Sequence, residues 1–368
     1  MPIVPRNVAV ILPPREGFGP GRTGAIGLLA RRLTQTPGFE TTIIGGKQDG
    51  PIFPGIDYQT VIPSLWSLGS TNLRYAGAVA GLLRQSRPAL IEVHNRPEIA
   101  LNLASRLPGI PVVSFLHNDP QGMRGAATPA ERTNMLRRLA GVITPSNYLR
   151  QRVLDGVETP DKDPVVLPNC LDLTELPPHR RRERLILFAG RVVADKAPDA
   201  FVSACAAALP HLPGWGAEII GADRFSSDSP DTGFVQMVRA AAEGANVRML
   251  GYRDHPEVLQ AMARAAIVVV PSRWPEPFGL VALEALASGA ALICSPRGGL
   301  PEVAGDAAIY ANPDDPAEIA AAIRSLARDE TRRSALAEAG WHRVQQFDVT
   351  RIAVRLAALR DGVVQRYG

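Results

Sequence analysis

Two glutamates eight positions apart, Glu276 and Glu284, are the first residues whose types and spacing could do chemistry. Glu284 lies in the otherwise apolar run Leu280–Ala287, where a carboxylate is costly unless something binds it. The two hydroxyl groups of a bound diol would provide that binding. The alternatives are an ordinary loop charge for Glu276 and a solvated helix face for Glu284.

A strand, a loop and a helix position these glutamates. Ile267–Val270 is a continuous β-branched run, which is typical of a strand buried on both faces of a parallel sheet. A proline-rich loop follows, and we expect the helix to begin near Phe278. The first N–H groups of a helix carry about half a positive charge, so this strand end favours an anionic ligand.

A second charged pair follows another apolar strand, Leu185–Ala189. Arg191 comes two positions after that strand and Lys196 follows five positions later. Cations at the end of a buried strand are well placed to meet an anion. The alternative is a surface arginine and lysine without a ligand.

These segments together resemble the donor-binding signature of the family 4 glycosyltransferases, which are retaining, sugar-nucleotide-dependent enzymes with the GT-B fold. The resemblance rests on the E-X7-E pattern, on Gly-Gly-Leu-Pro-Glu at 298–302, and on the G-R-x4-K pattern from Gly190 to Lys196. It implies an α/β protein of two Rossmann-like, doubly wound domains facing a cleft. The second domain would bind mainly the donor and the first mainly the acceptor.

The resemblance implies catalytic roles for three of the four charged residues. Arg191 and Lys196 would hold the donor diphosphate, because fixed cations stabilise the charge that develops on the leaving phosphate. Glu276 would grip a hydroxyl group of the donor sugar, and Glu284 would bind the ribose diol. The transfer would retain the anomeric configuration, with the departing phosphate taking the acceptor proton.

Backbone groups complete the donor site that the resemblance implies. The N–H groups of Phe278, Gly279 and Leu280 would face the sugar and the phosphate. Arg253 follows Gly251-Tyr252, which resembles the place where family members contact the nucleobase.

The glycine-rich segment Gly19–Gly24 matches G-x-G-x-x-G, the dinucleotide fingerprint. Six residues, with Pro13 and Pro14 among them, separate it from the expected strand 7–12, so a nicotinamide site is disfavoured. By resemblance, this loop instead approaches the donor diphosphate, with Gly24 as the family's loop glycine and Arg22 and Thr23 beside it. The family has a Gly-Gly pair where this chain has Thr23-Gly24.

Two polar clusters follow expected strands of the first half. His94-Asn95-Arg96 comes after Leu90–Val93, and His117-Asn118-Asp119 comes after Val112–Leu116. His117 matches the family's histidine at the junction of donor sugar and acceptor, which implies a catalytic role. His94 and Asp119 are predicted to lie on the acceptor side. Hydrogen-bonded structural side chains are the alternative for both.

The length of 368 residues predicts two domains of nearly equal size. We expect an N-terminal domain at 1–178, joined by a C-terminal helix at about 350–368, and a donor-binding domain at 179–349, with a polar linker at 176–184. Cys170 stands where the family has glycine, which predicts a different local turn.

Composition excludes several classes of protein. Residues 1–178 hold 18 Lys and Arg against 14 Asp and Glu, whereas the remainder is balanced; this modest excess argues against nucleic-acid binding. It leaves open a peripheral contact with an anionic membrane through arginines at 132–152, a solvated face being the alternative. Three distant cysteines and the lack of an acidic ion-binding motif predict no metal and no cofactor beyond the sugar nucleotide. Without a signal peptide or a membrane-spanning run, we expect a cytoplasmic protein.

The sequence thus predicts transfer of a hexose from a UDP- or GDP-linked donor to a saccharide or lipid-linked acceptor, in synthesis of cell-surface polysaccharide or lipopolysaccharide. A sugar-nucleotide 2-epimerase shares the fold and is the second hypothesis. A catalytically silent protein that only binds sugar nucleotides is the third.

Overall fold

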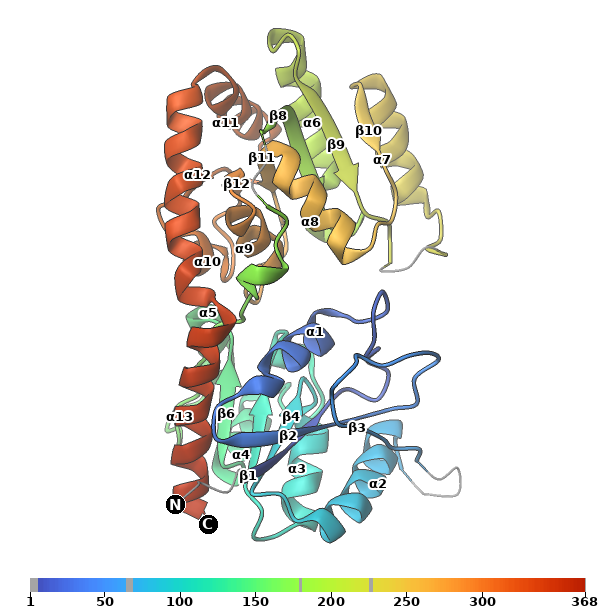
Figure 1. Ribbon diagram of the computed structural model, residues 1–368, viewed down its shortest axis with the longest axis vertical. Coiled ribbons are helices and arrows are strands. Elements are labelled where there is room, and N and C mark those ends of the chain that lie inside the picture. The colour runs from blue at the N-terminus through green and yellow to red at the C-terminus, as the bar shows by residue number, and fades with distance from the viewer. Residues whose placement is uncertain (1–5, 64–68, 179–180, 225–227, 368) are drawn as a thin grey trace. The chain divides into compact units, whose positions relative to one another are not determined.

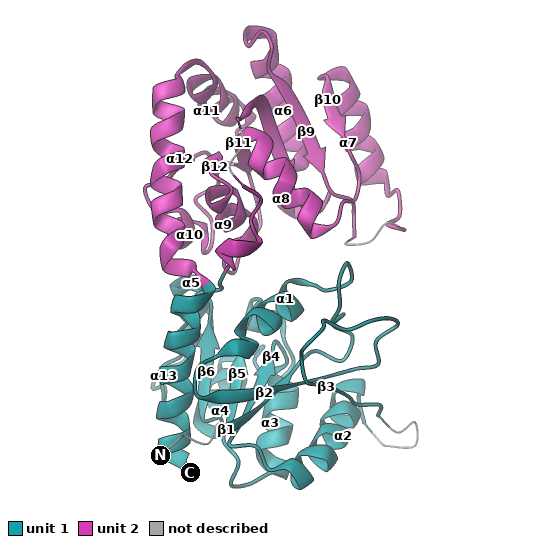
Figure 2. Ribbon diagram, viewed as in Figure 1, with its two compact units in different colours: residues 1–170, 349–368 teal, residues 171–348 magenta. Residues whose placement is uncertain are grey.

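The structure, a computed structural model, describes residues 6–63, 69–178, 181–224 and 228–367. The chain forms two compact units: residues 1–170 with 349–368, and residues 171–348 (Figure 2). Each unit is built around its own parallel sheet.

The sheet of unit 1 has the strand order β3-β2-β1-β4-β5-β6-β7, and every neighbouring pair is parallel (Figure 1). Its strands are β1 (Arg6–Ile11), β2 (Phe39–Gly45), β3 (Tyr58–Thr60), β4 (Leu90–His94), β5 (Val112–Phe115), β6 (Gly141–Thr144) and β7 (Val165–Val166). The order reverses between β1 and β4. Ligands of doubly wound sheets bind beyond the carboxyl ends of the strands at such a switch point.

Helices cover both faces of this sheet. They are α1 (Ala25–Arg32), α2 (Thr71–Ser86), α3 (Pro97–Arg106), α4 (Pro129–Arg138), α5 (Asn147–Leu154) and the C-terminal α13 (Val349–Tyr367). Ile91 and Val93 of β4 pack in one apolar cluster with side chains of α2, α3, α4 and α5. Because side chains alternate along a strand, Glu92 and His94 lie on the opposite face, where α13 contacts β4.

The sheet of unit 2 has the order β10-β9-β8-β11-β12-β13 and is also parallel throughout. Its strands are β8 (Glu183–Ala189), β9 (Gly216–Ile220), β10 (Val247–Met249), β11 (Ala265–Val270), β12 (Ala291–Cys294) and β13 (Ala308–Tyr310). Its helices are α6 (Pro198–Ala208), α7 (Gly233–Gly244), α8 (His255–Arg264), α9 (Leu280–Ala287), α10 (Leu300–Ala304), α11 (Pro316–Arg328) and α12 (Glu330–Val344). The switch point here lies between β8 and β11.

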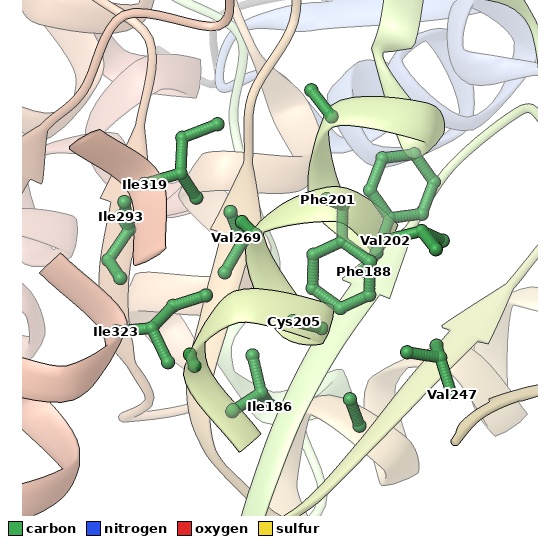
Figure 3. Close-up of a cluster of buried hydrophobic side chains, with 14 of the residues drawn as sticks. Ile186, Phe188, Phe201, Val202, Cys205, Val247, Val269, Ile293, Ile319 and Ile323 are labelled. Carbon is green, nitrogen blue, oxygen red and sulfur yellow. The ribbon is translucent and has the colours of Figure 1, made fainter. Parts of the chain in front are cut away.

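Strand β11 shows why this sheet needs helices on both faces. Ile267 and Val269 join an apolar cluster with α6, α7 and α11, and Val268 and Val270 join another with α8, α9 and α10. Figure 3 shows Val269 in the first cluster with Phe201 of α6 and Ile319 of α11. A strand whose two faces are both buried must be apolar throughout, as the β-branched run predicted. The α/β fold class with two doubly wound sheets is therefore confirmed.

The structure corrects one expected helix boundary. Helix α9 begins at Leu280 and not near Phe278, because Gly279 is its N-cap and has a left-handed φ of 106°. The Gly-Gly-Leu-Pro-Glu motif at 298–302 contains the start of the short helix α10, in which Pro301 occupies the first turn, where a proline is tolerated.

The junction between the units differs from the expected linker. The units divide after Cys170, and the N–H of Leu171 donates to the carbonyl of Phe347 (3.0 Å), so residues 171–178 belong to unit 2. Residues 179 and 180 of the expected linker lie outside the described residues. Cys170 has no positive φ, in agreement with the expectation that its turn differs from a glycine turn.

A buried ion pair fixes α13 to the sheet of unit 1. Arg360 of α13 donates two hydrogen bonds to the carboxylate of Glu92 in β4, both of 2.8 Å, and both side chains are 2% exposed. The guanidinium also lies 5.5 Å from the centre of the Phe39 ring. Each charge is tolerated in the interior only because the other is present.

This pairing predicts unequal effects of single and double substitution. Arg360→Met should lower the free energy of unfolding by about 3 to 5 kcal/mol, because it leaves the carboxylate of Glu92 buried without a partner. The double variant Glu92→Met/Arg360→Met should recover most of this loss, because it leaves no buried charge. Urea unfolding of the three proteins measures the difference, and a double variant as unstable as the single one would contradict it.

Candidate active site

The ends of β8 and β11 meet in an ion pair between Lys196 and Glu276. Lys196 closes the 3-10 turn Ala194–Lys196 after β8, and its Nζ contacts Oε1 of Glu276. The hydroxyl of Ser272 donates to the same oxygen (2.7 Å). Oε2 of Glu276 receives no hydrogen bond within the described ranges, so one carboxylate oxygen is anchored and the other is left for a ligand.

Main-chain hydrogen bonds hold the two strand ends together. The carbonyl of Asp195 accepts from the N–H groups of Arg273 (2.8 Å) and Trp274 (2.9 Å) and from Oγ of Ser272 (3.2 Å). Arg273 also forms a two-pronged ion pair with Asp199 at 2.8 Å for each bond. The loop before Glu276 is thus fixed to the turn that carries Lys196.

Glycines allow another loop to approach Glu276 closely. The N–H of Gly299 donates to the carbonyl of Glu276 (2.6 Å). Gly298 has a φ of 65°, and a Cβ there would lie 2.3 Å from that carbonyl oxygen. A side chain at 298 would therefore displace Glu276, which explains the glycine pair physically.

Glu284 has a partner that the sequence did not reveal. Its carboxylate is 6% exposed, and its Oε1 lies 2.7 Å from Nε2 of His255, the first residue of α8. His255 and Glu284 are 29 positions apart, so no local pattern joins them. The buried glutamate is not on a solvated helix face, and its Oε2 has no hydrogen bond in the part of the chain that the structure describes.

The remaining predicted donor residues lie at the same edge of unit 2. Arg191 follows β8 and is half-buried, and Phe278 packs edge-on against Phe347 at the start of α9. The first N–H groups of α9, at Leu280 and beyond, have no acceptor within the helix. Arg253 is exposed, and its guanidinium donates to the carbonyl of the preceding residue (2.8 Å).

In unit 1 a carboxylate lies beside the predicted Gly24 loop. Oε1 of Glu16 accepts from the N–H of Gly27 in the first turn of α1 (3.1 Å), and a Cβ on Gly24 would lie 2.6 Å from the same oxygen. Burial raises the pKa of Glu16, against hydrogen bonds and the charge of Arg96, which lower it. A side chain at position 24 would displace the carboxylate of Glu16, a residue that the sequence reasoning missed.

The neighbours of Gly24 have local roles as well. The hydroxyl of Thr23 donates to the carbonyl of Gly17 (2.8 Å). Arg22 is exposed, with its guanidinium beside Gly50. Both residues thus help to shape the loop from β1 to α1.

His94 and His117 come together at the ends of β4 and β5. Nδ1 of His94 lies 3.0 Å from Nε2 of His117, and the rings are stacked with centres 5.1 Å apart. Burial, and next to it the charge of Arg360, lowers the pKa of His94 to about 3. Burial and the neighbouring His94 lower the pKa of His117 well below its usual range, so both rings are neutral at pH 7.

Asp119 is separate from this pair. Its carboxylate forms an ion pair with Nε of Arg152 (2.8 Å) and accepts from the N–H of Gln121 (3.0 Å). These contacts fix the loop after β5 to α5. They favour the structural alternative for Asp119 over the acceptor role.

The expected basic surface on α4 and α5 is smaller in the structure. Arg132 is buried and donates to main-chain carbonyls, including that of Val153 (3.0 Å). Arg150 pairs with Asp163 (2.8 Å). Arg137 and Arg138 are exposed.

Comparisons with known proteins bear on this arrangement. The family model described as "Glycosyltransferase Family 4" matches residues 26–175, and that described as "Glycosyl transferases group 1" matches residues 175–343. The glycogen synthase of Mycobacterium tuberculosis is 30% identical over 300 residues, which cover 75% of this chain and 69% of that protein. The chain belongs to the family 4 glycosyltransferases.

Solved structures agree in fold with this glycosyltransferase. Sucrose-phosphate synthase from Thermosynechococcus elongatus matches with a TM-score of 0.80 and 20% identity, covering 98% of this chain and all of that one. The Anabaena protein HepE, in complex with UDP and glucose, matches with a TM-score of 0.76 and 18% identity, covering 96% and 99%. The fold is therefore GT-B.

In the part of the chain that the structure describes, no helix is long and apolar enough to cross a membrane. Among those residues, His, Cys, Asp and Glu nowhere gather in a group of three suited to hold a metal ion.

The neutral histidine pair predicts destabilisation by acid. The unfolded chain binds protons near the ordinary histidine pKa of about 6.5, whereas the folded chain does not. The full contribution of the pair to the free energy of unfolding is therefore present above that pH. This contribution falls as the pH is lowered from about 6.5 towards the pKa of the histidines in the folded chain. For His94 alone the loss between about pH 6.5 and pH 5 is about 2 kcal/mol.

Urea unfolding at both pH values measures this loss. His342→Gln is a matched control, because His342 is exposed, and it should follow the wild type. Equal free energies of unfolding at the two pH values would contradict the prediction.

Proposed function

We propose that this glycosyltransferase moves a hexose from a UDP- or GDP-linked donor to a saccharide or lipid-linked acceptor, with retention of configuration. The observation that carries the proposal is the joining of Lys196 and Glu276 at the switch point of unit 2. It places a cation for phosphate and a carboxylate for a hydroxyl group at one strand edge. A donor of a phosphate-linked sugar needs both.

The two anchored glutamates fit the two hydroxyl-bearing parts of such a donor. Glu276 is held through Oε1 by Lys196 and Ser272, which leaves Oε2 to accept from a sugar hydroxyl. Glu284 is held by His255 and leaves its own Oε2 for the ribose diol. A second oxygen on a fixed carboxylate binds a hydroxyl with little loss of side-chain entropy.

The chemistry proposed for the remaining residues is electrostatic. Arg191 and Lys196 stabilise charge on the leaving diphosphate, aided by the N–H groups at the start of α9. The leaving phosphate takes the proton of the acceptor hydroxyl on the face from which it departs. The ring of His117, a residue of unit 1, contacts the sugar. UDP is the first nucleotide to test, because HepE was solved with UDP.

Removal of either cation should slow transfer strongly. Arg191→Ala and Lys196→Ala should each lower kcat by roughly 10² to 10³-fold, the usual cost of deleting one charge-stabilising group. Release of UDP from UDP-glucose, with a screen of saccharide acceptors, measures the rate. Arg328→Ala is the control, since Arg328 is exposed at the far end of α11 and should keep the wild-type rate. Near-normal rates from both site variants would refute the assignment.

The proposal includes catalysis without a metal ion. The two cations supply positive charge where a divalent ion would otherwise neutralise the diphosphate. Transfer should therefore continue at an unchanged rate in excess EDTA. Loss of activity that added Mg²⁺ or Mn²⁺ restores would contradict this part.

Product analysis separates the proposal from its two rivals. A 2-epimerase changes the sugar nucleotide with no acceptor present, whereas a transferase releases the nucleoside diphosphate. A silent binding protein does neither. The cations Arg191 and Lys196 with the glutamates Glu276 and Glu284 argue against the silent protein, and product analysis decides between the two enzymes.

The acceptor is proposed to belong to cell-surface polysaccharide or lipopolysaccharide synthesis, at the cytoplasmic face of the membrane. The support is the positive charge of the first half of the sequence, of which Arg137 and Arg138 are exposed on α4. Sedimentation with liposomes tests the contact. Equal binding with and without anionic lipid would remove it.

A further inference from the structure

The side chain of His94 is placed to act on His117 and not on a ligand directly. It is 3% exposed, and its ring stacks on Phe115 with centres 4.7 Å apart and planes 4° from parallel. Its Nδ1 lies 3.0 Å from Nε2 of His117 and forms a hydrogen bond with it. A buried side chain of this kind fits poorly with the acceptor contact that the sequence predicted.

The main chain around His117 is fixed equally firmly. Oδ1 of Asn95 accepts from the N–H groups of His117 (3.1 Å) and Asn118 (3.2 Å). Asn95 is buried with a left-handed φ of 55°, and its own N–H donates to the carbonyl of Phe115 (2.6 Å). A residue other than glycine in this conformation costs about 1 to 2 kcal/mol, so the surrounding contacts must hold it there.

The second nitrogen of His117 has no hydrogen-bond partner in the part of the chain that the structure describes. Its Nδ1 is buried and forms no hydrogen bond with any described residue. Such an atom is costly to bury unless something else satisfies it. Because Nε2 is engaged by His94, Nδ1 is the ring nitrogen of His117 that remains for another partner.

The hydrogen bond between the two neutral imidazoles couples the tautomers of the two rings. A neutral ring carries one N–H, so the ring that donates in the His94–His117 bond decides whether Nδ1 of His117 is a donor or an acceptor. A free histidine at this place would sample both tautomers. The bond with His94 couples the tautomer of His117 to that of His94, because only one of the two rings can donate in it.

The surroundings of the pair keep it neutral. Among the described residues, the charged groups near His94 include Arg360 of α13, which pairs with Glu92 of β4. On the side of α1, Leu29 and Leu33 line a cavity of about 20 Å³ beside the two rings. An apolar wall and a nearby cation both disfavour an imidazolium.

We propose that His94 is a positioning residue, which fixes the tautomer and the ring orientation of His117 and so leaves Nδ1 of His117 as the group that binds a hydroxyl of the substrate. The contact with substrate rests on the proposed function, whereas the fixing of the tautomer does not. The experiment therefore has one arm for each.

The first arm observes the imidazole nitrogens by ¹⁵N NMR of the whole chain. The protein has 6 histidines, so single substitutions suffice to assign His94 and His117. In the wild type, His117 should show one fixed tautomer that does not change with pH near neutrality. In His94→Phe, which keeps a ring against Phe115, His117 should show mixed tautomers and should titrate at a higher pH.

Two further variants separate positioning from packing. His94→Asn offers a hydrogen-bonding group near the place of Nδ1 and should restore a single tautomer of His117. If His94→Phe does not fold, His94→Asn is the variant in which the tautomer of His117 is measured. Glu92→Met/Arg360→Met should raise the pH at which His94 takes up a proton, without freeing the tautomer of His117. The proposal would be overturned if His117 gave wild-type signals in His94→Phe. The same holds if His117 gave wild-type signals in a folded His94→Asn that has lost the hydrogen bond between residues 94 and 117.

The second arm measures transfer. His94→Phe should lower kcat roughly 10-fold, as expected for one hydrogen bond in a buried network, and should leave the KM of the donor unchanged. It should also make the rate fall towards acid pH, where the wild type stays level, and His94→Asn should recover part of the loss. If His94→Phe changes the NMR signals of His117 but leaves the rate of transfer and its pH profile unchanged, only the proposed contact with substrate is overturned. Absence of transfer in the wild type would count against the proposed function and leave the first arm valid.

Discussion

The ion pair between Lys196 and Glu276 is the contact on which the site of unit 2 depends. It joins the turn after β8 to the loop after β11, the two strands between which the sheet order reverses. Parallel strands carry their carboxyl ends to one edge, so a residue following either strand meets the same space. The carbonyl of Asp195, bonded to the loop after β11, makes this meeting rigid. The donor would then enter a site already in place, which reduces the entropy lost on binding.

Unit 1 uses the same geometry for a different arrangement of charge. At its switch point, between β1 and β4, the structure places the carboxylate of Glu16 and the neutral pair of His94 and His117. Unit 2 offers cations beside its carboxylates, whereas the histidines of unit 1 are kept neutral by burial. A hydroxyl-bearing ligand fits such a surface better than a phosphate does. This difference supports donor binding in one unit and acceptor binding in the other.

The C-terminal helix connects the stability of unit 1 with its candidate site. Arg360 of α13 pairs with Glu92, and Glu92 lies two positions before His94 on the same face of β4. The guanidinium that holds the helix in place therefore also lies near enough to His94 to lower its pKa. One buried cation thus serves packing and electrostatics together, because a charge in a low-dielectric interior acts over several ångströms.

The sequence by itself determined the fold class, because β-branched runs alternating with helical segments are compatible only with parallel sheets covered on both faces. It also predicted Glu276, Glu284, Arg191 and Lys196 as a group, since Arg191, Lys196 and Glu276 follow strands and Glu284 is a carboxylate inside an apolar helix; their roles stay predictions. Only the tertiary structure supplied their partners. His255 reaches Glu284 across 29 positions and Arg360 reaches Glu92 across 268, and no local pattern encodes such pairs. Contacts between distant side chains depend on how the helices pack on the sheet, which residue spacing does not fix.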